Sequence, residues 1–302
     1  MKLLVTGFNG FVAGSILAQA PSDWEVHGIG RSAIPVDTGK IHYHLIDMLD
    51  EKALKVAFAD IRPDAVIHAA GIANIDFCEN NRATAYAVNV GATERISSFC
   101  ADIGAKLVFC STDTVFDGQK SFYTEHDALS SVNYYGETKI KAEQLVRDAG
   151  PGNVVARLAL VMGIPVMGTG NSFLAEMIGK LQNKEPLKMA TNEIRTPVDV
   201  VTLGAALLEL AASDFTGTIH LSGNSRVNRF EMANRIAAAL GFSGSKIDPI
   251  NSSELKGRAP RPSDVSLSNE KARSILKTPF LSLEDGLKLS LEKGNRKFTT
   301  TN

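Results

Sequence analysis

A glycine-rich turn near the start of the chain joins a short apolar run to a helical pattern, and it restricts the fold more than any other feature. Residues 2–6 are apolar and strand-like, and residues 10–20 have the spacing of a helix that ends before Pro21. Between them, Gly7 permits a tight turn and Gly10 lets backbone N–H groups approach a ligand closely. Because the turn opens a helix N-terminus, it predicts a dinucleotide-binding site; an ordinary glycine turn is the alternative.

Apolar runs and helical patterns alternate along the first half of the chain. Strands joined by helices form a parallel sheet with helices on both faces, so we predict an α/β fold with a doubly wound parallel sheet of the Rossmann type. After residue 158 the pattern loosens, which predicts a smaller C-terminal α/β substrate-binding lid. The expected strands are residues 2–6, 24–30, 41–46, 65–68, 106–110 and 154–159, and the expected helices are residues 10–20, 50–60, 82–103 and 134–149. The expected domains are a dinucleotide-binding domain, residues 1–158, to which residues 199–212 return, and a substrate-binding domain, residues 159–198 and 213–302.

Hydroxyl and amine side chains follow the strand expected at residues 106–110. Ser111 and Thr112 come at its carboxyl end, where ligands bind in open α/β sheets. Tyr135 and Lys139 lie four residues apart in an expected helix, so they share one face. A nearby ammonium lowers the pKa of a phenol, which then donates or accepts a proton near neutral pH. Thr112, Tyr135 and Lys139 therefore predict carbonyl–alcohol interconversion; a helix-face aromatic beside a solvated lysine is the alternative.

The order of these features resembles the extended short-chain dehydrogenase/reductase family. Residues 111–116 are similar to the Ser-Thr-Asp-Tyr-Val-Phe motif of its dTDP-4-dehydrorhamnose reductase-like branch, except that Thr114 replaces the tyrosine. Residues 75–79 resemble the Val-Asp-x-x-Glu of that branch, and residues 261–267 resemble the Arg-Pro segment of its sugar-nucleotide domain. The resemblance implies NADPH-dependent reduction of a 4-keto group on a nucleotide-linked deoxysugar. Thr114 leaves the identity of the sugar open, because a ring that could pack on sugar or base is missing.

The residues after the second expected strand indicate which dinucleotide binds. An acidic residue there would bind the ribose 2′-hydroxyl of NAD, whereas this chain has Arg31 and Ser32. A guanidinium and a hydroxyl suit a 2′-phosphate, so we predict NADP, with NAD as the alternative if Arg31 is only a surface charge. The resemblance adds Asp47 and Met48 at the adenine, although Asp47 is also placed to cap the following helix. The predicted cofactor-binding residues are Gly7, Asn9, Gly10, Phe11, Val12, Arg31, Ser32, Asp47, Met48, Ala69, Ala70, Gly71, Tyr135 and Lys139.

Arginines in the C-terminal part are the candidate ligands for the diphosphate of a nucleotide-sugar substrate. Arg195 and Arg261 lie in loop-like stretches with prolines, where a guanidinium can be held for two parallel hydrogen bonds. Surface arginine is the alternative for both. The predicted substrate-binding residues are Asp113, Arg195 and Arg261. The resemblance implies that hydride passes from NADPH to the carbonyl carbon while Tyr135 protonates the oxygen.

Two other functions use the same scaffold. A nucleotide-sugar 4-epimerase uses the same three catalytic residues, although such enzymes usually retain NAD, which fits Arg31 poorly. The regulatory subunit of methionine adenosyltransferase resembles these reductases and acts chiefly as a partner protein, so a non-catalytic dinucleotide-binding subunit is the alternative from another class. A dehydratase fits less well, because dehydratases usually carry Asp-Glu after the catalytic threonine and this chain has Asp113-Thr114.

Charge and composition argue against several classes of partner. The formal net charge of −1 gives no field that would attract nucleic acid or an anionic membrane. The first 20 residues resemble a signal peptide, but glycines interrupt the apolar stretch and cleavage would remove the predicted phosphate turn, so we expect a cytoplasmic protein. The 3 cysteines lack metal-ligand spacing, and we predict no metal site. Apolar positions on two expected helices predict a homodimer, as in relatives that pair such helices; they are Ala85, Val88, Ile96, Ile140 and Leu145.

Overall fold

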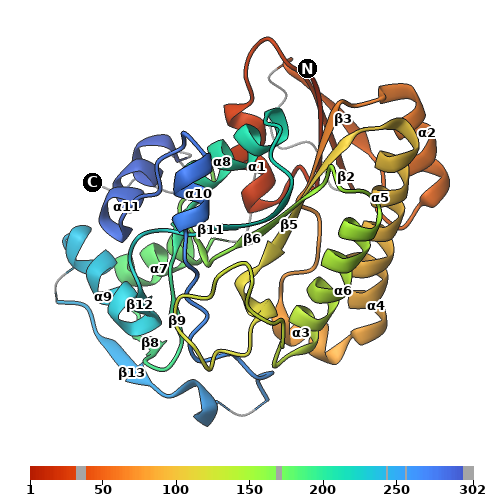
Figure 1. Ribbon diagram of the computed structural model, residues 1–302. Helices are drawn as coiled ribbons and strands as arrows, with labels where there is room; N and C mark the ends of the chain where they lie inside the picture. Colours follow the sequence, from red (N-terminus) through yellow and green to blue (C-terminus); the bar gives the residue numbers. More distant parts are fainter. Residues whose placement is uncertain (32–38, 168–171, 243, 256, 295–302) are drawn as a thin grey trace.

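The central sheet of the molecule has 7 strands, and every neighbouring pair is parallel (Figure 1). The computed structural model describes residues 1–31, 39–167, 172–242, 244–255 and 257–294. The order across the sheet is β11-β6-β5-β4-β1-β2-β3. The strands are β1 (Lys2–Thr6), β2 (Glu25–Gly30), β3 (Ile41–Leu45), β4 (Ala65–His68), β5 (Lys106–Thr112), β6 (Val154–Leu158) and β11 (Gly217–Leu221). This sheet confirms the predicted doubly wound α/β fold.

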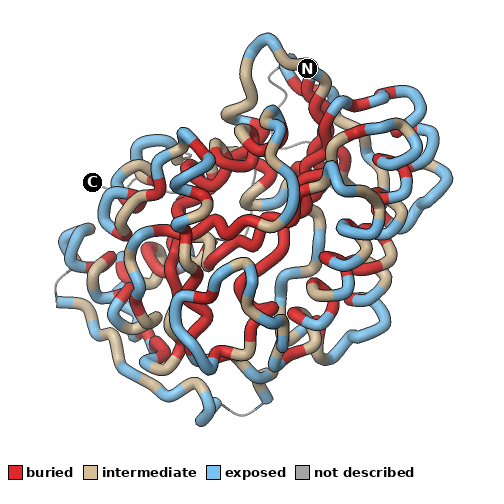
Figure 2. The backbone as a smooth tube through the Cα atoms, viewed as in Figure 1, coloured by how far each residue is buried: buried red, intermediate tan, exposed pale blue. Residues whose placement is uncertain are grey.

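Helices cover both faces of the sheet, and a separate apolar core lies on each side. On one face, α1 (Phe11–Gln19) and α8 (Val200–Ala212) pack together, and their side chains join those of the sheet in one core. On the other face, α2 (Glu51–Ile61), α5 (Ala92–Ile103) and α6 (Tyr134–Asp148) enclose a second core. Figure 2 shows the middle of the sheet as buried. Burial on both faces explains why the central strands β1 and β4 are mostly apolar.

Local signals in the sequence set where several of these helices begin and end. Asp50 begins α2 by accepting a hydrogen bond from the N–H of Ala53 at 3.0 Å. Asn133 begins α6 in the same way, accepting from the N–H of Gly136 at 3.0 Å. Gly104 ends α5 with φ 71°, a left-handed conformation that glycine adopts without strain. The cap at Asn133 fixes the first turn of α6, where a predicted catalytic side chain lies.

A smaller α/β region after β6 has an apolar core of its own, which confirms the predicted smaller C-terminal part. Its main helices are α7 (Phe173–Gln182), α9 (Arg229–Ala239) and α11 (Leu283–Lys293). Short strand pairs accompany them: β8 (Leu187–Ala190) with β13 (Ile247–Ile250), and β9 (Ile194–Arg195) with β12 (Val227–Asn228). The remaining strands and α-helices are β7 (Val161–Met162), β10 (Val198–Asp199), α3 (Ile75–Asn80), α4 (Arg82–Tyr86) and α10 (Glu270–Ile275). The role of the smaller C-terminal region as a substrate-binding lid stays a prediction.

The predicted domain division differs from the structure at β11. The sequence places residues 213–302 in the substrate-binding domain, but β11 pairs with β6 at the edge of the central sheet. Ile219 and Leu221 on this strand are fully buried. The helix α8 leads into β11 as part of one strand–helix–strand connection, which packs back on the sheet. Residues 217–221 therefore return to the sheet together with the helix expected at 199–212.

The helix expected at residues 82–103 is three elements in the structure. A π-helical turn, η1 (Ala87–Gly91), separates α4 from α5. Such a turn carries an extra residue and often occurs at functional sites. It turns Asn89 inward, where 2% of this residue is exposed. Two of the positions proposed for a dimer contact, Ala85 and Ile96, are fully buried within the chain, so they support the core and not an interface.

Candidate active site

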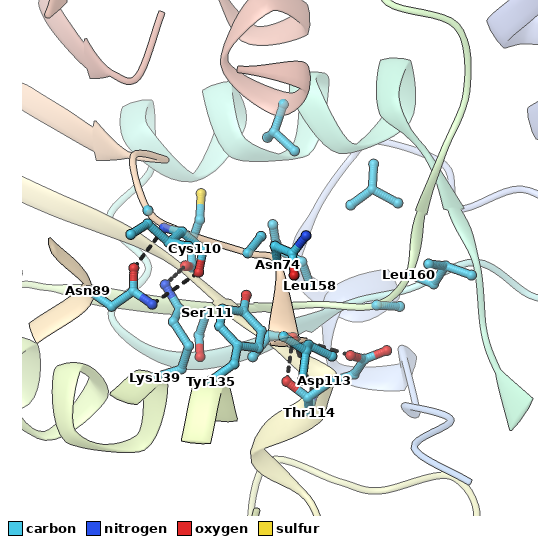
Figure 3. A pocket seen from close by; sticks show the side chains of 18 of the residues that line it. Asn74, Asn89, Cys110, Ser111, Asp113, Thr114, Tyr135, Lys139, Leu158 and Leu160 are labelled. Carbon is cyan, nitrogen blue, oxygen red and sulfur yellow. Dashed lines mark hydrogen bonds between the residues drawn. The ribbon is translucent and has the colours of Figure 1, made fainter. Parts of the chain in front are cut away.

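A cavity of about 500 Å³ lies at the carboxyl ends of β4, β5 and β6 (Figure 3). Its walls are the loop after β4, the end of β5, the first turns of α6, and residues 158–161 after β6, together with arginines of the C-terminal region. This is the edge of a parallel sheet where ligands bind. The cavity brings together all of the predicted catalytic and substrate-binding residues: Thr112, Asp113, Tyr135, Lys139, Arg195 and Arg261.

The hydroxyl-bearing residues Thr112 and Tyr135 both line this cavity. Thr112 ends β5 and accepts a hydrogen bond from the N–H of Thr114 at 3.2 Å, which begins the 3-10 turn η2 (Asp113–Val115). The hydroxyl of Thr112 lies beside the phenol of Tyr135 and acts to lower the pKa of that phenol. Close packing holds them there, because a Cβ atom at Gly136 would lie 2.3 Å from the carbonyl oxygen of Thr114. Glycine directly after Tyr135 is therefore required by the packing of α6.

Lys139 does not lower the pKa of Tyr135 as the sequence predicts. Burial raises the pKa of Tyr135 above its ordinary value, and the hydroxyl of Thr112 offsets only part of that effect. The ammonium of Lys139 instead donates to the carbonyl oxygen of Cys110 at 2.6 Å and lies 4.0 Å from the ring centroid of Phe109. Burial lowers the pKa of Lys139 to about 8. The phenol is thus protonated at neutral pH, which is the state a proton donor needs.

The predicted cofactor residues divide into two groups. One group lines the cavity: Val12, Ala69, Ala70, Gly71, Tyr135 and Lys139. The other, outside the cavity lining, belongs to the segments after β1, β2 and β3: Gly7, Asn9, Gly10, Phe11, Arg31, Asp47 and Met48. The remaining predicted residue, Ser32, lies outside the described residues. Because neighbouring parallel strands end at one edge, the second group continues the same edge of the sheet past the cavity.

The structure fits a dinucleotide at this edge. Gly7 has φ 76°, and a Cβ atom there would lie 3.0 Å from Cα of Ala70, so only glycine lets the turn pass this close. The N–H groups that begin α1 have no side-chain cap at Gly10. Asp47 is not the helix cap, since Asp50 caps α2. The carboxylate of Asp47 accepts from the N–H of Leu49 at 2.9 Å and lies 3.9 Å from Arg31.

The two predicted substrate arginines already have partners within the chain. Arg195 donates to the carbonyl oxygens of Ile194 at 2.7 Å and Pro262 at 3.2 Å, and its Nε lies 3.8 Å from Oδ2 of Asp113. Arg261 donates to Oδ2 of Asp76 and to the carbonyl oxygen of Ala259, each at 2.8 Å. These contacts hold the cavity wall together. Sequence reasoning missed Asp76 as a partner, because 185 residues separate it from Arg261.

The cavity lining also contains charged residues outside the predicted site residues. Arg258 donates to the carboxylate of Glu193 at 2.6 Å, and both line the cavity. Arg229, the first residue of α9, lines it as well. In the sequence, Arg229 is recognisable only as a charged residue that follows the helix cap Asn228. That pattern does not show that the start of the helix faces the cavity.

Residues 1–295 match the family model of the RmlD substrate binding domain. The chain belongs to this family. It is 31% identical over 301 residues to methionine adenosyltransferase 2 subunit beta of Mus musculus, covering 96% of this chain and 87% of that protein. It is also 28% identical over 296 residues to the dTDP-4-dehydrorhamnose reductase of Mycobacterium tuberculosis, covering 96% of this chain and 92% of that protein.

Solved structures of RmlD-like proteins have the same fold. A dTDP-4-dehydrorhamnose reductase of Clostridium acetobutylicum superposes with a TM-score of 0.84 at 25% identity, covering 97% of this chain and 99% of that one. A Bacillus anthracis dTDP-4-dehydrorhamnose reductase solved in complex with NADP superposes with a TM-score of 0.83 at 24% identity, covering 97% and 99% of the two chains. The recognition of an extended short-chain dehydrogenase/reductase from the sequence is confirmed.

Within the described residues of this RmlD-family chain, no cluster of His, Cys, Asp or Glu could hold a metal ion. Across the same described ranges, no helix is long and apolar enough to span a bilayer. The 3 cysteines, Cys78, Cys100 and Cys110, are buried and unpaired. Burial raises the pKa of Cys110 to about 12, so this thiol beside the cavity stays protonated.

Asn89 holds the loop that forms one wall of the cavity. Its Oδ1 accepts from the N–H of Ile72 at 2.8 Å, and its Nδ2 donates to the carbonyl oxygen of Ile72 at 3.1 Å. The same amide nitrogen donates to the hydroxyl of Thr138 at 3.1 Å. The buried side-chain amide of Asn89 therefore has hydrogen-bond partners for both its oxygen and its nitrogen. The π-helical turn positions Asn89 so that it contacts both the loop and α6.

Two buried histidines predict that the free energy of unfolding falls as the pH is lowered. Burial lowers the pKa of both His68 and His220 to about 3. The unfolded chain binds these protons with a pKa of about 6.5 and the folded chain does not, so stability is lost from about pH 6.5 downward. Each histidine should contribute about 1.4 kcal/mol per pH unit. Urea unfolding between pH 7 and 5 measures the decline, and His220→Gln should make it shallower; an unchanged slope would contradict the prediction.

Proposed function

We propose that this RmlD-family chain catalyses NADPH-dependent reduction of a 4-keto group on a nucleotide-linked deoxysugar. The observation that carries the proposal is that Thr112, Tyr135 and Lys139 line one cavity at the carboxyl edge of the sheet. A phenol that is protonated at neutral pH and lies beside a second hydroxyl is equipped to protonate a carbonyl oxygen. The glycine turn at Gly7 continues the same edge, where a dinucleotide would be bound.

Thr112, Tyr135 and Lys139 each have a separate role in this reaction. NADPH, when bound, supplies the hydride. The hydroxyl of Thr112 holds the carbonyl oxygen of the substrate, and the phenol of Tyr135 gives it a proton as negative charge develops there. Lys139 offers its ammonium to the cofactor ribose. Ala69, Ala70 and Gly71 are small enough to leave room beside them for a flat ring.

Turnover of NADPH with a panel of nucleotide-linked 4-keto sugars tests the proposal. We expect oxidation of NADPH that depends on the nucleotide sugar, with little or none for the same keto sugar lacking its nucleotide. The product should carry a new hydroxyl at the position of the ketone. Absence of turnover across dTDP-linked and UDP-linked 4-keto sugars would contradict the proposal.

The choice between NADPH and NADH should depend on Arg31. Its side chain is 76% exposed at the end of β2, and its Nη1 lies 3.9 Å from Oδ2 of Asp47. A guanidinium that binds a 2′-phosphate contributes about 1.5–3 kcal/mol, so Arg31→Ala should weaken NADPH by that amount and NADH hardly at all. Calorimetric titration with both cofactors measures the difference. Equal losses for the two cofactors would point to a change in folding instead.

A second candidate is a partner protein, which the similarity to methionine adenosyltransferase 2 subunit beta favours. The similarity extends along 96% of this chain, so it is not limited to the dinucleotide-binding half. A methionine adenosyltransferase catalytic subunit, mixed with this chain in light scattering, separates the candidates. A stable complex without any NADPH turnover would favour the partner protein. A nucleotide-sugar 4-epimerase is distinguished by interconversion of the two sugars with no net consumption of cofactor.

The predicted homodimer stays a prediction. The exposed side chains on the surface of α3 and α4 include Phe77 and Tyr86, which are 41% and 45% exposed. A two-fold contact between copies would cover them, because symmetric dimers use the same patch on both chains. Light scattering at micromolar concentration should give twice the mass of 32.3 kDa. A monomer mass would refute it.

A further inference from the structure

The cavity lining has more arginines than carboxylates. It includes the arginines Arg195, Arg229, Arg258 and Arg261, and the carboxylates Asp76, Asp113 and Glu193. Each carboxylate has an arginine of its own: Asp76 pairs with Arg261 at 2.8 Å, Glu193 with Arg258 at 2.6 Å, and Asp113 with Arg195 at 3.8 Å. Of these four arginines, Arg229 is the one that is not paired with any of the three carboxylates.

Arg229 is held in place but not neutralised. Its guanidinium carbon lies 4.4 Å from the ring centroid of Phe173, which fixes the plane of the group. Its Nη1 is buried and has no hydrogen-bond partner among the described residues. Glu193 and Asp113 attract it from a distance, while Arg195 and Arg258 repel it. A buried cation with an open N–H is costly unless a ligand supplies an acceptor.

We propose that Arg229 binds a phosphate group of the nucleotide-sugar substrate, in the place that the sequence assigns to Arg261. The proposal rests on the proposed function, because it names the group that would receive the diphosphate of that substrate. Arg261 already donates to Ala259 and Asp76, and that carboxylate matches its charge, whereas Nη1 of Arg229 has no acceptor among the described residues. A guanidinium fixed in one plane is suited to the oxygens of a phosphate.

Binding of dTDP and UDP tests the assignment without any need for turnover. Arg229→Gln should weaken the nucleoside diphosphate at least tenfold, about 1.4 kcal/mol, and leave NADPH affinity unchanged. Arg235→Gln is the matched control: it lies on the same helix, but its Nε donates to Glu284 at 2.7 Å on the surface. The control should bind like the original chain. Nucleoside diphosphate affinity that survives Arg229→Gln and is lost in Arg261→Gln would overturn the proposal, as would an original chain that binds neither nucleotide.

Thermal unfolding of the free protein separates a ligand-binding arginine from a structural one. Removing an unpaired cation should leave the midpoint of Arg229→Gln unchanged or higher. Arg258→Gln should lower the midpoint, because Glu193, which is 5% exposed, then loses its partner. A midpoint for Arg229→Gln that falls as far, together with weaker NADPH binding, would show that the arginine is structural and overturn the proposal.

The two proposals fail in different ways. If nucleoside diphosphates bind through Arg229 but no 4-keto sugar is reduced, the proposed reaction is wrong and the phosphate site stands. If 4-keto sugars are reduced equally well by the original chain and by Arg229→Gln, the reaction stands and this site is wrong. Inorganic pyrophosphate and dTMP, titrated in parallel, show whether the site needs the whole nucleoside diphosphate or only a phosphate group.

Discussion

Tyr135→Phe is expected to lower the rate of NADPH-dependent reduction about a hundredfold or more, the usual scale for removing one general acid. The phenylalanine ring keeps the shape of the side chain and the packing at Gly136, so the fold should be unchanged. What is lost is the hydroxyl that shares the cavity with Thr112. NADPH affinity should stay within about twofold, because Lys139 and the glycine turn are untouched. Steady-state rates and calorimetric titration on the same preparation measure both quantities.

Tyr134→Phe is the matched control for this experiment. Tyr134 is the preceding residue of α6, but its ring packs under the guanidinium of Arg82 at 4.7 Å and does not line the cavity. The control should keep nearly the full rate. Near-normal turnover in Tyr135→Phe would contradict its role as the proton donor, and equal losses in the two variants would indicate damage to α6 instead.

Arg157→Met is expected to lower the free energy of unfolding by about 3–5 kcal/mol, the scale for removing one partner of a buried ion pair. Arg157 on β6 and Glu143 on α6 are 3% and 0% exposed. Three hydrogen bonds join them: Nη2 donates to Oε2 at 2.9 Å, and Nε donates to Oε1 at 3.0 Å and to Oε2 at 3.3 Å. The hydroxyl of Ser111 also donates to Glu143, at 2.6 Å. Methionine would leave that carboxylate without its buried charge partner, and only the partly exposed Arg147 would remain beside it. Urea unfolding followed by circular dichroism measures the loss.

Arg147→Met provides the comparison on the same carboxylate. Arg147 reaches Oε2 of Glu143 at 3.2 Å from the surface, where its side chain is 36% exposed. Its removal should cost less than about 1 kcal/mol, as for exposed ion pairs. The double variant Glu143→Met/Arg157→Met should recover much of the loss, since an apolar pair no longer buries a charge. Equal effects of Arg147→Met and Arg157→Met would contradict the importance of the buried contact.

The sheet was predictable because each of its strands carries its own signal. Residues 65–67 of β4 and 107–110 of β5 are uninterrupted apolar runs, and the turn at Gly7 marks where the first strand ends. Pairing between distant side chains carries no such signal. The ion pair between Arg261 and Asp76 spans 185 residues, and nothing near Arg261 in the sequence names its partner. Arg261 does line the cavity. The sequence could not show that its guanidinium is already paired with Asp76.

The electrostatics of Tyr135 and Lys139 show a second limit. Four-residue spacing on a helix puts both side chains on one face, and the structure confirms that both line the cavity. The pKa values of both groups depend mainly on burial, and the spacing of residues in the sequence does not reveal burial. The ammonium of Lys139 donates to the carbonyl oxygen of Cys110 in β5 at 2.6 Å. The sequence predicts that this ammonium acts on the phenol of Tyr135. Likewise, the π-helical turn around Asn89 adds one residue to a helix, which a regular periodicity cannot reveal.

The place of β11 at the edge of the sheet has a consequence for the order of events on the ribosome. β6 ends at residue 158, and its sheet partner β11 begins only at residue 217. At an elongation rate of about 5–20 residues per second, the edge of β6 therefore remains unpaired for several seconds after it is made. An open edge of this kind can pair with another chain. The first half of the protein thus cannot finish folding as a unit before the second half is synthesised, and aggregation of nascent chains would be most acute in that interval.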